Sequence, residues 1–162
     1  MERLWSPWRM EYVKSAAVDD DADCIFCDLP QKGNDEKHLI VARRELAFVM
    51  LNAYPYNPGH LMVAPFRHAG DLTELADSEH LACIDLLRSS IAALRDEVSP
   101  HGFNVGMNLG RVAGAGIPGH LHWHVVPRWN GDTNFMPVLG QTKVLPELLE
   151  ETRAKLAPRL SG

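Results

Sequence analysis

Three histidines separated by single apolar residues stand at His120, His122 and His124 of this 162-residue chain. On a β-strand successive side chains point to opposite faces, so the three imidazoles would share one face at a spacing of roughly 7 Å. The alternating apolar residues would anchor the other face in the core. A neutral imidazole is a competent nucleophile and proton carrier near pH 7, because its unperturbed pKa is about 6.5. The pattern predicts a catalytic strand, and the alternative is a polar, solvent-exposed face.

A glycine-rich segment at 110–119, GRVAGAGIPG, directly precedes this strand. Glycines at Gly114 and Gly116 let backbone N–H groups approach phosphate oxygens closely. The segment therefore predicts a phosphate-binding loop, and a flexible connection between two strands remains the alternative.

Two of the three cysteines form the pair Cys24-x-x-Cys27. Such a pair is redox active, metal binding or inert. A thioredoxin-like redox pair would follow a strand, whereas this one follows an acidic run. The small, odd number of cysteines argues against a disulfide framework. The third, Cys83, falls on an expected helix and is interpreted as a core residue.

Hydrophobic periodicity predicts the elements that must position these residues. Strands are expected at 38–42, 46–51, 60–65, 103–109 and 120–126, with a long helix over 72–98 and a C-terminal helix over 146–160. Asp71 would cap the long helix, and Pro100 lies beyond its end. The sum is an α+β domain with a mostly antiparallel sheet of about five strands.

Length and charge limit the classes of protein that the chain can belong to. The 162 residues suit a single domain over 1–162, with an N-terminal arm at 1–23 and a C-terminal tail and helix at 130–162. A net charge of −5 disfavours binding to a nucleic acid polymer. No apolar run suits a membrane helix, and residues 1–13 do not resemble a signal peptide. We therefore expect a cytoplasmic protein with no membrane contact.

The histidine row, with the two apolar residues after it and Pro127–Arg128, resembles the motif of the histidine-triad (HIT) family. A second block, Asn52-x-x-Pro55-x-x-Pro58-Gly59-His60, strengthens the likeness. The segments LWSPWRMEYV and NGDTNFMPVLGQTKVLPE are most similar to the bacterial diadenosine tetraphosphate phosphorylase branch. The resemblance implies the HIT-like fold.

The resemblance also implies roles for individual residues. The middle histidine, His122, would attack the α-phosphate and become nucleotidylated. His124 would contact the nucleotide and donate a proton or a hydrogen bond to the bridging or leaving oxygen. Asn52 would bind the ribose, although a turn-capping asparagine is the alternative. Asn108 would touch a phosphate, and His60 would support the site.

Some relatives bind zinc through two cysteines, a later histidine and the first histidine of the triad. These positions correspond to Cys24, Cys27, His68 and His120, so the resemblance implies a structural zinc ion with no open position. The remaining histidines, at positions 38, 80 and 101, are interpreted as surface residues.

The expected function is a nucleotidyltransferase or hydrolase acting on the α-phosphate of dinucleoside polyphosphates. Diadenosine tetraphosphate (Ap4A) phosphorolysis is the preferred case, and hydrolysis of dinucleoside polyphosphates or of adenosine phosphoramidates is the alternative. A non-catalytic nucleotide-binding protein and a three-histidine metalloenzyme are further alternatives. Family members commonly form homodimers, so we expect one here.

Overall fold

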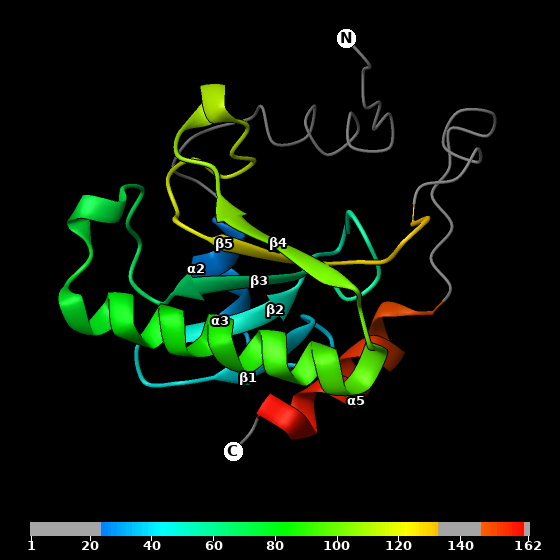
Figure 1. The fold of residues 1–162 in the computed structure, drawn as a ribbon. Coiled ribbons are helices and arrows are strands. Elements are labelled where there is room, and N and C mark those ends of the chain that lie inside the picture. Colours follow the sequence, from blue (N-terminus) through cyan, green and yellow to red (C-terminus); the bar gives the residue numbers. More distant parts are fainter. Residues whose placement is uncertain (1–23, 133–146, 161–162) are drawn as a thin grey trace, which may run out of the picture.

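The computed structural model describes residues 24–132 and 147–160. Five antiparallel strands form one sheet in the order β1-β2-β3-β5-β4. Figure 1 shows the long helix α3 across one face of this sheet and the short helix α2 on the other. The expected α+β fold and five-stranded antiparallel sheet are confirmed.

The strands lie close to the expected positions, and most of their boundaries shift by a residue or two. They are β1 (Ile40–Arg43), β2 (Ala47–Leu51), β3 (Leu61–Pro65), β4 (Gly102–Met107) and β5 (Trp123–Arg128). The largest difference is in β5, which begins three residues after the expected start, so only the last histidine of the row lies in a strand.

The helices differ more from the expectation. The predicted long helix is divided into a 3-10 turn, η1 (Leu72–Glu74), and helix α3 (Asp77–Val98), with Asp71 capping only the turn. Helix α5 (Leu149–Leu160) starts later than predicted. Helix α2 (Ile25–Gln31) was not predicted at all.

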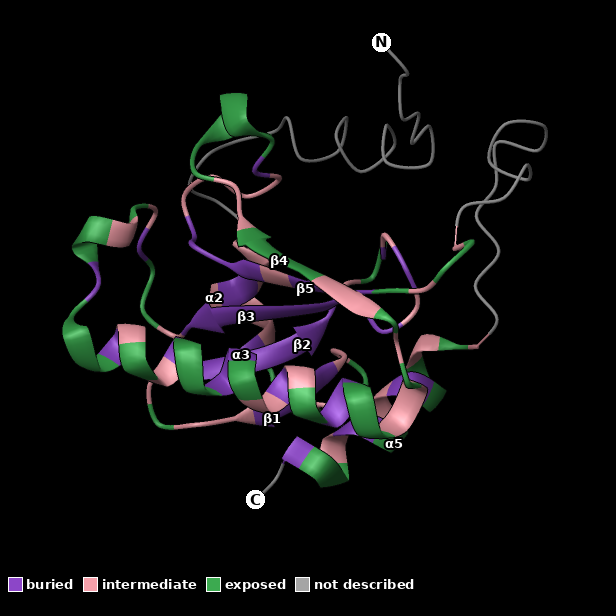
Figure 2. Cartoon of the chain, in the orientation of Figure 1, coloured by how far each residue is buried: buried purple, intermediate pink, exposed green. Residues whose placement is uncertain are grey.

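The core has two parts because the central strands are buried on both faces (Figure 2). Alternate residues of β2 and β3, such as Val49 and Val63, pack with α3 and α5. The residues between them, such as Met50 and Met62, pack with Phe26 of α2. This two-sided burial explains why both strands read as continuous apolar runs.

Burial along α3 corrects part of the predicted stripe. Cys83, Leu86 and Leu94 are fully buried as expected, but Leu81 and Ile84 are 70% and 54% exposed. The helix therefore contacts the sheet through a narrower face than its apolar periodicity indicates.

Candidate active site

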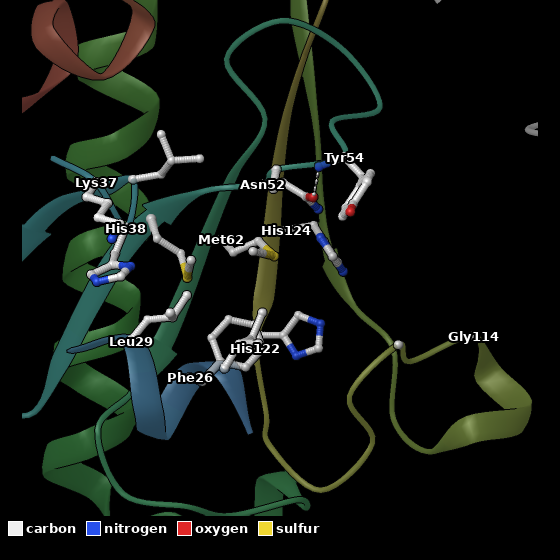
Figure 3. Close-up of a pocket in the computed structure, with 15 residues that line it drawn as sticks. Phe26, Leu29, Lys37, His38, Asn52, Tyr54, Met62, Gly114, His122 and His124 are labelled. Carbon is white, nitrogen blue, oxygen red and sulfur yellow. Dashed lines mark hydrogen bonds between the residues drawn. The ribbon is translucent and has the colours of Figure 1, made fainter. Parts of the chain in front are cut away.

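A pocket of about 400 Å³ opens on the α2 face of the sheet. In Figure 3 it runs from His122 and His124 at one end to Lys37 and His38 at the other. Its lining combines apolar side chains with a few polar groups, an arrangement typical of small-molecule sites. The lining residues are Ile25, Phe26, Leu29, Lys37, His38, Leu39, Met50, Asn52, Ala53, Tyr54, Met62, Gly114, Gly116, His122 and His124.

The hydrogen bond made by His122 determines its tautomer. Its Nδ1 atom lies 2.8 Å from the backbone carbonyl oxygen of His120. A carbonyl only accepts hydrogen bonds, so Nδ1 carries the proton and Nε2 carries the lone pair. Burial lowers the pKa of His122 below its usual value, which keeps the ring neutral near pH 7. The side chain is therefore held in the form that a nucleophile requires.

A chain of hydrogen bonds determines the tautomers of His60 and His124 in the same way. The backbone N–H of Tyr56 donates to Nδ1 of His60 over 3.1 Å, so the His60 proton sits on Nε2. That nitrogen donates to Nδ1 of His124 over 2.9 Å. Neutral His124 then carries its own proton on Nε2, so that this nitrogen can donate a hydrogen bond. His60 is fully buried, and its described contact with a pocket residue is the one to His124.

The three histidine side chains do not lie evenly spaced on one face of a strand. His122 and His124 approach to 5.0 Å between ring centroids in an edge-to-face arrangement. The side chain of His120 points away from the pocket to Cys24 and Cys27. The predicted alternation holds for the apolar partners, because Leu121 and Trp123 join the α3 side of the core. The prediction of a strand beginning at His120 was wrong.

The glycine loop reaches the pocket through its backbone. Gly114 and Gly116 line the pocket, and Gly114 has a φ of +95°, a conformation that L side chains rarely adopt. Asn108 is not among the described lining residues. Its side-chain amide lies 3.5 Å from the carbonyl oxygen of Gly114, so it meets the loop rather than the pocket.

Asn52 makes a local turn and also lines the pocket. Its Oδ1 atom accepts a hydrogen bond from the backbone N–H of Tyr54 at 2.8 Å, which makes a local turn. The residue also lines the pocket. Since the oxygen is engaged by the turn, the two N–H donors of the amide are the groups suited to contact a ligand.

Helix α2, which was not predicted from the sequence, supplies one apolar wall of the pocket. Ile25, Phe26 and Leu29 all line the pocket, and Phe26 stacks on His122 with ring centroids 4.7 Å apart at 29°. The spacing of these three residues places them on one face of a helical turn, and this was the only sequence signal for the helix. Seven residues are too few to identify a helix by periodicity.

The prediction of a surface position for His38 was wrong, because the half-buried residue lines the pocket. The preceding turn begins at Asn34 and ends at Leu39, and both have positive φ. Such values are uncommon outside glycine and could not be read from the sequence. His101 is exposed as expected, and His80 is half-buried.

A cluster of four side chains lies beside the pocket. One sulfur or nitrogen atom from each of Cys24, Cys27, His68 and His120 lies within 4.8 Å of all the others. The Nδ1 atom of His120 is 3.2 Å and 3.4 Å from the two sulfurs, and that of His68 is 3.3 Å from Cys27. The structure brings together all four residues that the resemblance implied.

The cluster fits a tetrahedral zinc ion in geometry and in donor type. Zinc bonds of about 2.3 Å to sulfur and about 2.0 Å to nitrogen would separate the two donors by roughly 3.5 Å, close to the distances observed. The Nε2 atom of His120 lies 2.9 Å from the carbonyl oxygen of Pro65, so Nδ1 presents its lone pair to the cysteines. Burial lowers the pKa of His120 to about 4, which leaves the imidazole neutral for coordination.

No helix among the described residues is long and apolar enough to cross a membrane.

Comparisons with known proteins agree with this geometry. The chain is 45% identical over 163 aligned positions to a Mycobacterium tuberculosis protein named AP-4-A phosphorylase, covering 97% of this chain and 83% of that one. It is 31% identical over 107 positions to an adenosine 5′-monophosphoramidase of Schizosaccharomyces pombe, covering 66% and 75% of the two chains.

A zinc-bound histidine triad family protein from Mycobacterium smegmatis has a similar structure, with a TM-score of 0.69 and 25% identity over 85% of this chain and 93% of that one. Residues 33–131 match the family model described as the HIT domain. The chain therefore belongs to the histidine triad (HIT) family.

Proposed function

We propose that this chain is an enzyme that transfers a nucleotidyl group from a dinucleoside polyphosphate, with Ap4A phosphorolysis as its reaction. The observation that carries the proposal is the contact of 2.8 Å between Nδ1 of His122 and the carbonyl oxygen of His120. The Nδ1 proton of His122 is held by this carbonyl, so Nε2 presents a lone pair in the pocket. The name of the Mycobacterium tuberculosis relative supports phosphate as the acceptor.

The pocket suits one nucleotide. The apolar walls made by Phe26, Leu29 and Met50 would hold the base, and the N–H groups of Asn52 would contact the ribose. The backbone of the loop at Gly114 and Gly116 would contact the phosphates. Asn108 would act indirectly, through the carbonyl of Gly114.

The reaction would proceed in two displacements. In the first, Nε2 of His122 forms a bond to the α-phosphorus, and the bond from that phosphorus to the bridging oxygen breaks. The Nε2–H of His124 donates a hydrogen bond to the departing oxygen, and the polyphosphate leaves as the ATP anion. In the second, an oxygen of inorganic phosphate attacks the same phosphorus and the bond to His122 breaks. Ap4A and phosphate would thus give ATP and then ADP.

The proposal includes a structural zinc ion held by Cys24, Cys27, His68 and His120. Bound zinc would cross-link the start of α2 to the segment that carries the nucleophile. Four protein ligands leave no open position, so the ion would act on structure rather than on substrate. The name of the Mycobacterium smegmatis structure supports zinc in this family.

A cytoplasmic homodimer completes the proposal. Strand β4 forms one edge of the sheet, and its residues Asn104, Val105 and Gly106 are exposed. The opposite edge strand, β1, contacts helix α5. An exposed edge strand readily pairs with a second copy of itself, and light scattering of the purified protein would measure its mass.

Product analysis with and without inorganic phosphate tests the proposed reaction. ATP and ADP formed only with phosphate would support a phosphorylase. ATP and AMP formed without phosphate would establish the alternative, a hydrolase. The adenosine phosphoramidate activity named for the Schizosaccharomyces pombe relative makes adenosine 5′-phosphoramidate the next substrate to assay. AMP binding without turnover of any of these would indicate a non-catalytic protein.

A further inference from the structure

The four-residue cluster and the nucleotide pocket share one short helix. Helix α2 spans Ile25–Gln31, with Cys24 as its N-cap and Cys27 in its first turn. The backbone N–H groups of Cys27 and Asp28 both donate to the carbonyl of Cys24 over 2.9 Å. Any movement of either cysteine therefore moves the residues between them, Ile25 and Phe26, which line the pocket.

Phe26 touches both sites directly. Its ring centroid lies 5.2 Å from that of His120 in the cluster and 4.7 Å from that of His122 in the pocket. The side chain is only 1% exposed and packs against both histidine rings. Closely packed interiors transmit small displacements, because no void absorbs them.

A second connection runs through the backbone. The imidazole of His120 belongs to the cluster, and the carbonyl of the same residue holds the Nδ1 proton of His122. A shift of His120 toward or away from a metal ion therefore changes the hydrogen bond that orients the nucleophile.

Helix α2 needs these contacts because it is short. Isolated helices of fewer than about 12 residues are marginal in water, and α2 has seven. Its described anchors outside the cluster include the bond from Arg43 to the carbonyl of Pro30 and the packing of Phe26 near Phe48. Ordering its first turn therefore depends heavily on what binds on either side of it.

We propose that Phe26 is a positioning residue that couples metal binding in the Cys24–Cys27–His68–His120 cluster to nucleotide binding in the pocket. Metal orders α2 and so prepares the wall that the base contacts. A bound nucleotide packs against that wall and so prepares the cysteines for metal. The two ligands tighten each other's binding by the same factor, as thermodynamic linkage requires. The inference rests on the zinc ion and the nucleotide pocket of the proposed function.

The test measures zinc affinity by chelator competition, with and without saturating AMP, and AMP affinity with and without zinc. In the natural chain we expect each ligand to raise the affinity of the protein for the other about fivefold or more. In Phe26→Leu, which keeps an apolar side chain but removes the ring that packs against both histidines, this factor should fall close to one. The matched control is Phe103→Leu, the same substitution at a residue that packs with the α3 side of the core and not with α2.

Equal loss of coupling in both variants would overturn the proposal, since the linkage would then reflect general folding stability. Zinc affinity that does not respond to AMP would also overturn it, as would a natural chain that binds no zinc. Ap4A turnover is assayed separately on the same samples. Coupling without turnover would contradict only the proposed reaction, and turnover without coupling would contradict only this inference.

Discussion

The carbonyl oxygen of His120 and the Nδ1 atom of His122 lie 2.8 Å apart, and this contact orients the proposed nucleophile. One residue thereby has two functions, because its side chain faces the cysteines while its backbone holds the next histidine in the row. The side chain of the first histidine lies in the four-residue cluster, and the second and third histidines line the pocket.

His60 is expected to act on catalysis through His124. Replacing His60 with phenylalanine removes the proton that Nε2 donates to His124 and leaves the tautomer of His124 undetermined. We expect kcat for Ap4A to fall by about 10- to 100-fold. The KM should change little, because His60 is not among the described lining residues.

His60→Gln is the matched variant, since its amide can still donate a hydrogen bond and should restore part of kcat. An unchanged kcat in His60→Phe would contradict the role assigned to the pair. If the fraction of folded protein, measured by circular dichroism, falls as much as kcat does, His60 has a packing role instead.

Asn52 is expected to recognise the ribose through its amide N–H groups. AMP should bind about tenfold more tightly than 2′,3′-dideoxy-AMP, because the hydroxyl contacts are worth about 1 kcal/mol or more. In Asn52→Ala the difference between the two ligands should disappear, which a double-mutant cycle by calorimetry would measure.

Asn52→Asp is the control for the turn, since its carboxylate can still accept from the backbone of Tyr54. If Asn52→Ala weakens both ligands equally, the residue only shapes the turn and the ribose contact is wrong.

Much of this site could be predicted because side-chain chemistry and spacing are local properties. The Asn52 position, the Cys24 and Cys27 pair and the glycine loop were all found by reading short segments. The sheet was also predictable, since β2 and β3 are continuous apolar runs.

The unpredicted parts depend on contacts between distant segments. Helix α2 is too short to show a period, and its position follows from packing against β2 and β3. His38 lines the pocket from a turn that ends at Leu39, and the positive φ of Leu39 could not be read from the sequence. Asn108 matched a motif, but nothing in the sequence showed that its amide would meet the loop.

Ser90 offers a test of the core, because its hydroxyl is fully buried and has no hydrogen-bond partner among the described residues. A buried hydroxyl without a partner carries a desolvation cost, so Ser90→Ala should leave stability unchanged or raise it by about 1 kcal/mol. The contrast is Thr152→Val. The hydroxyl of Thr152 donates to Glu147 at 2.9 Å, so its removal should lower the free energy of unfolding by about 1 kcal/mol. Urea unfolding of both variants would measure these changes, and a clear loss in Ser90→Ala would contradict the assignment.

The ion pair between Glu79 and Arg67 predicts acid sensitivity. The hydrogen bonds from Arg67 lower the pKa of Glu79 to about 2, with the backbone N–H of Ala76 adding to the effect. Because the folded-state pKa is depressed, this stabilisation is complete above about pH 4.5 and is lost as pH falls toward 2.

Glu79→Gln should therefore show a shallower fall in unfolding free energy than the natural chain between pH 4.5 and pH 2. The exposed carboxylate of Glu45 provides the control, since Glu45→Gln should keep the natural slope. Identical slopes for the natural chain and Glu79→Gln would show that other groups determine the acid transition.

The most direct test of the central claim is to trap the covalent intermediate on His122. The protein would be mixed with Ap4A without phosphate, quenched at alkaline pH and analysed by peptide mass spectrometry. We predict the added mass of one AMP on the peptide that contains His122, its absence in His122→Ala, and its discharge to ADP when phosphate is added. Undiminished turnover by His122→Ala, or an adduct on another residue, would contradict the account.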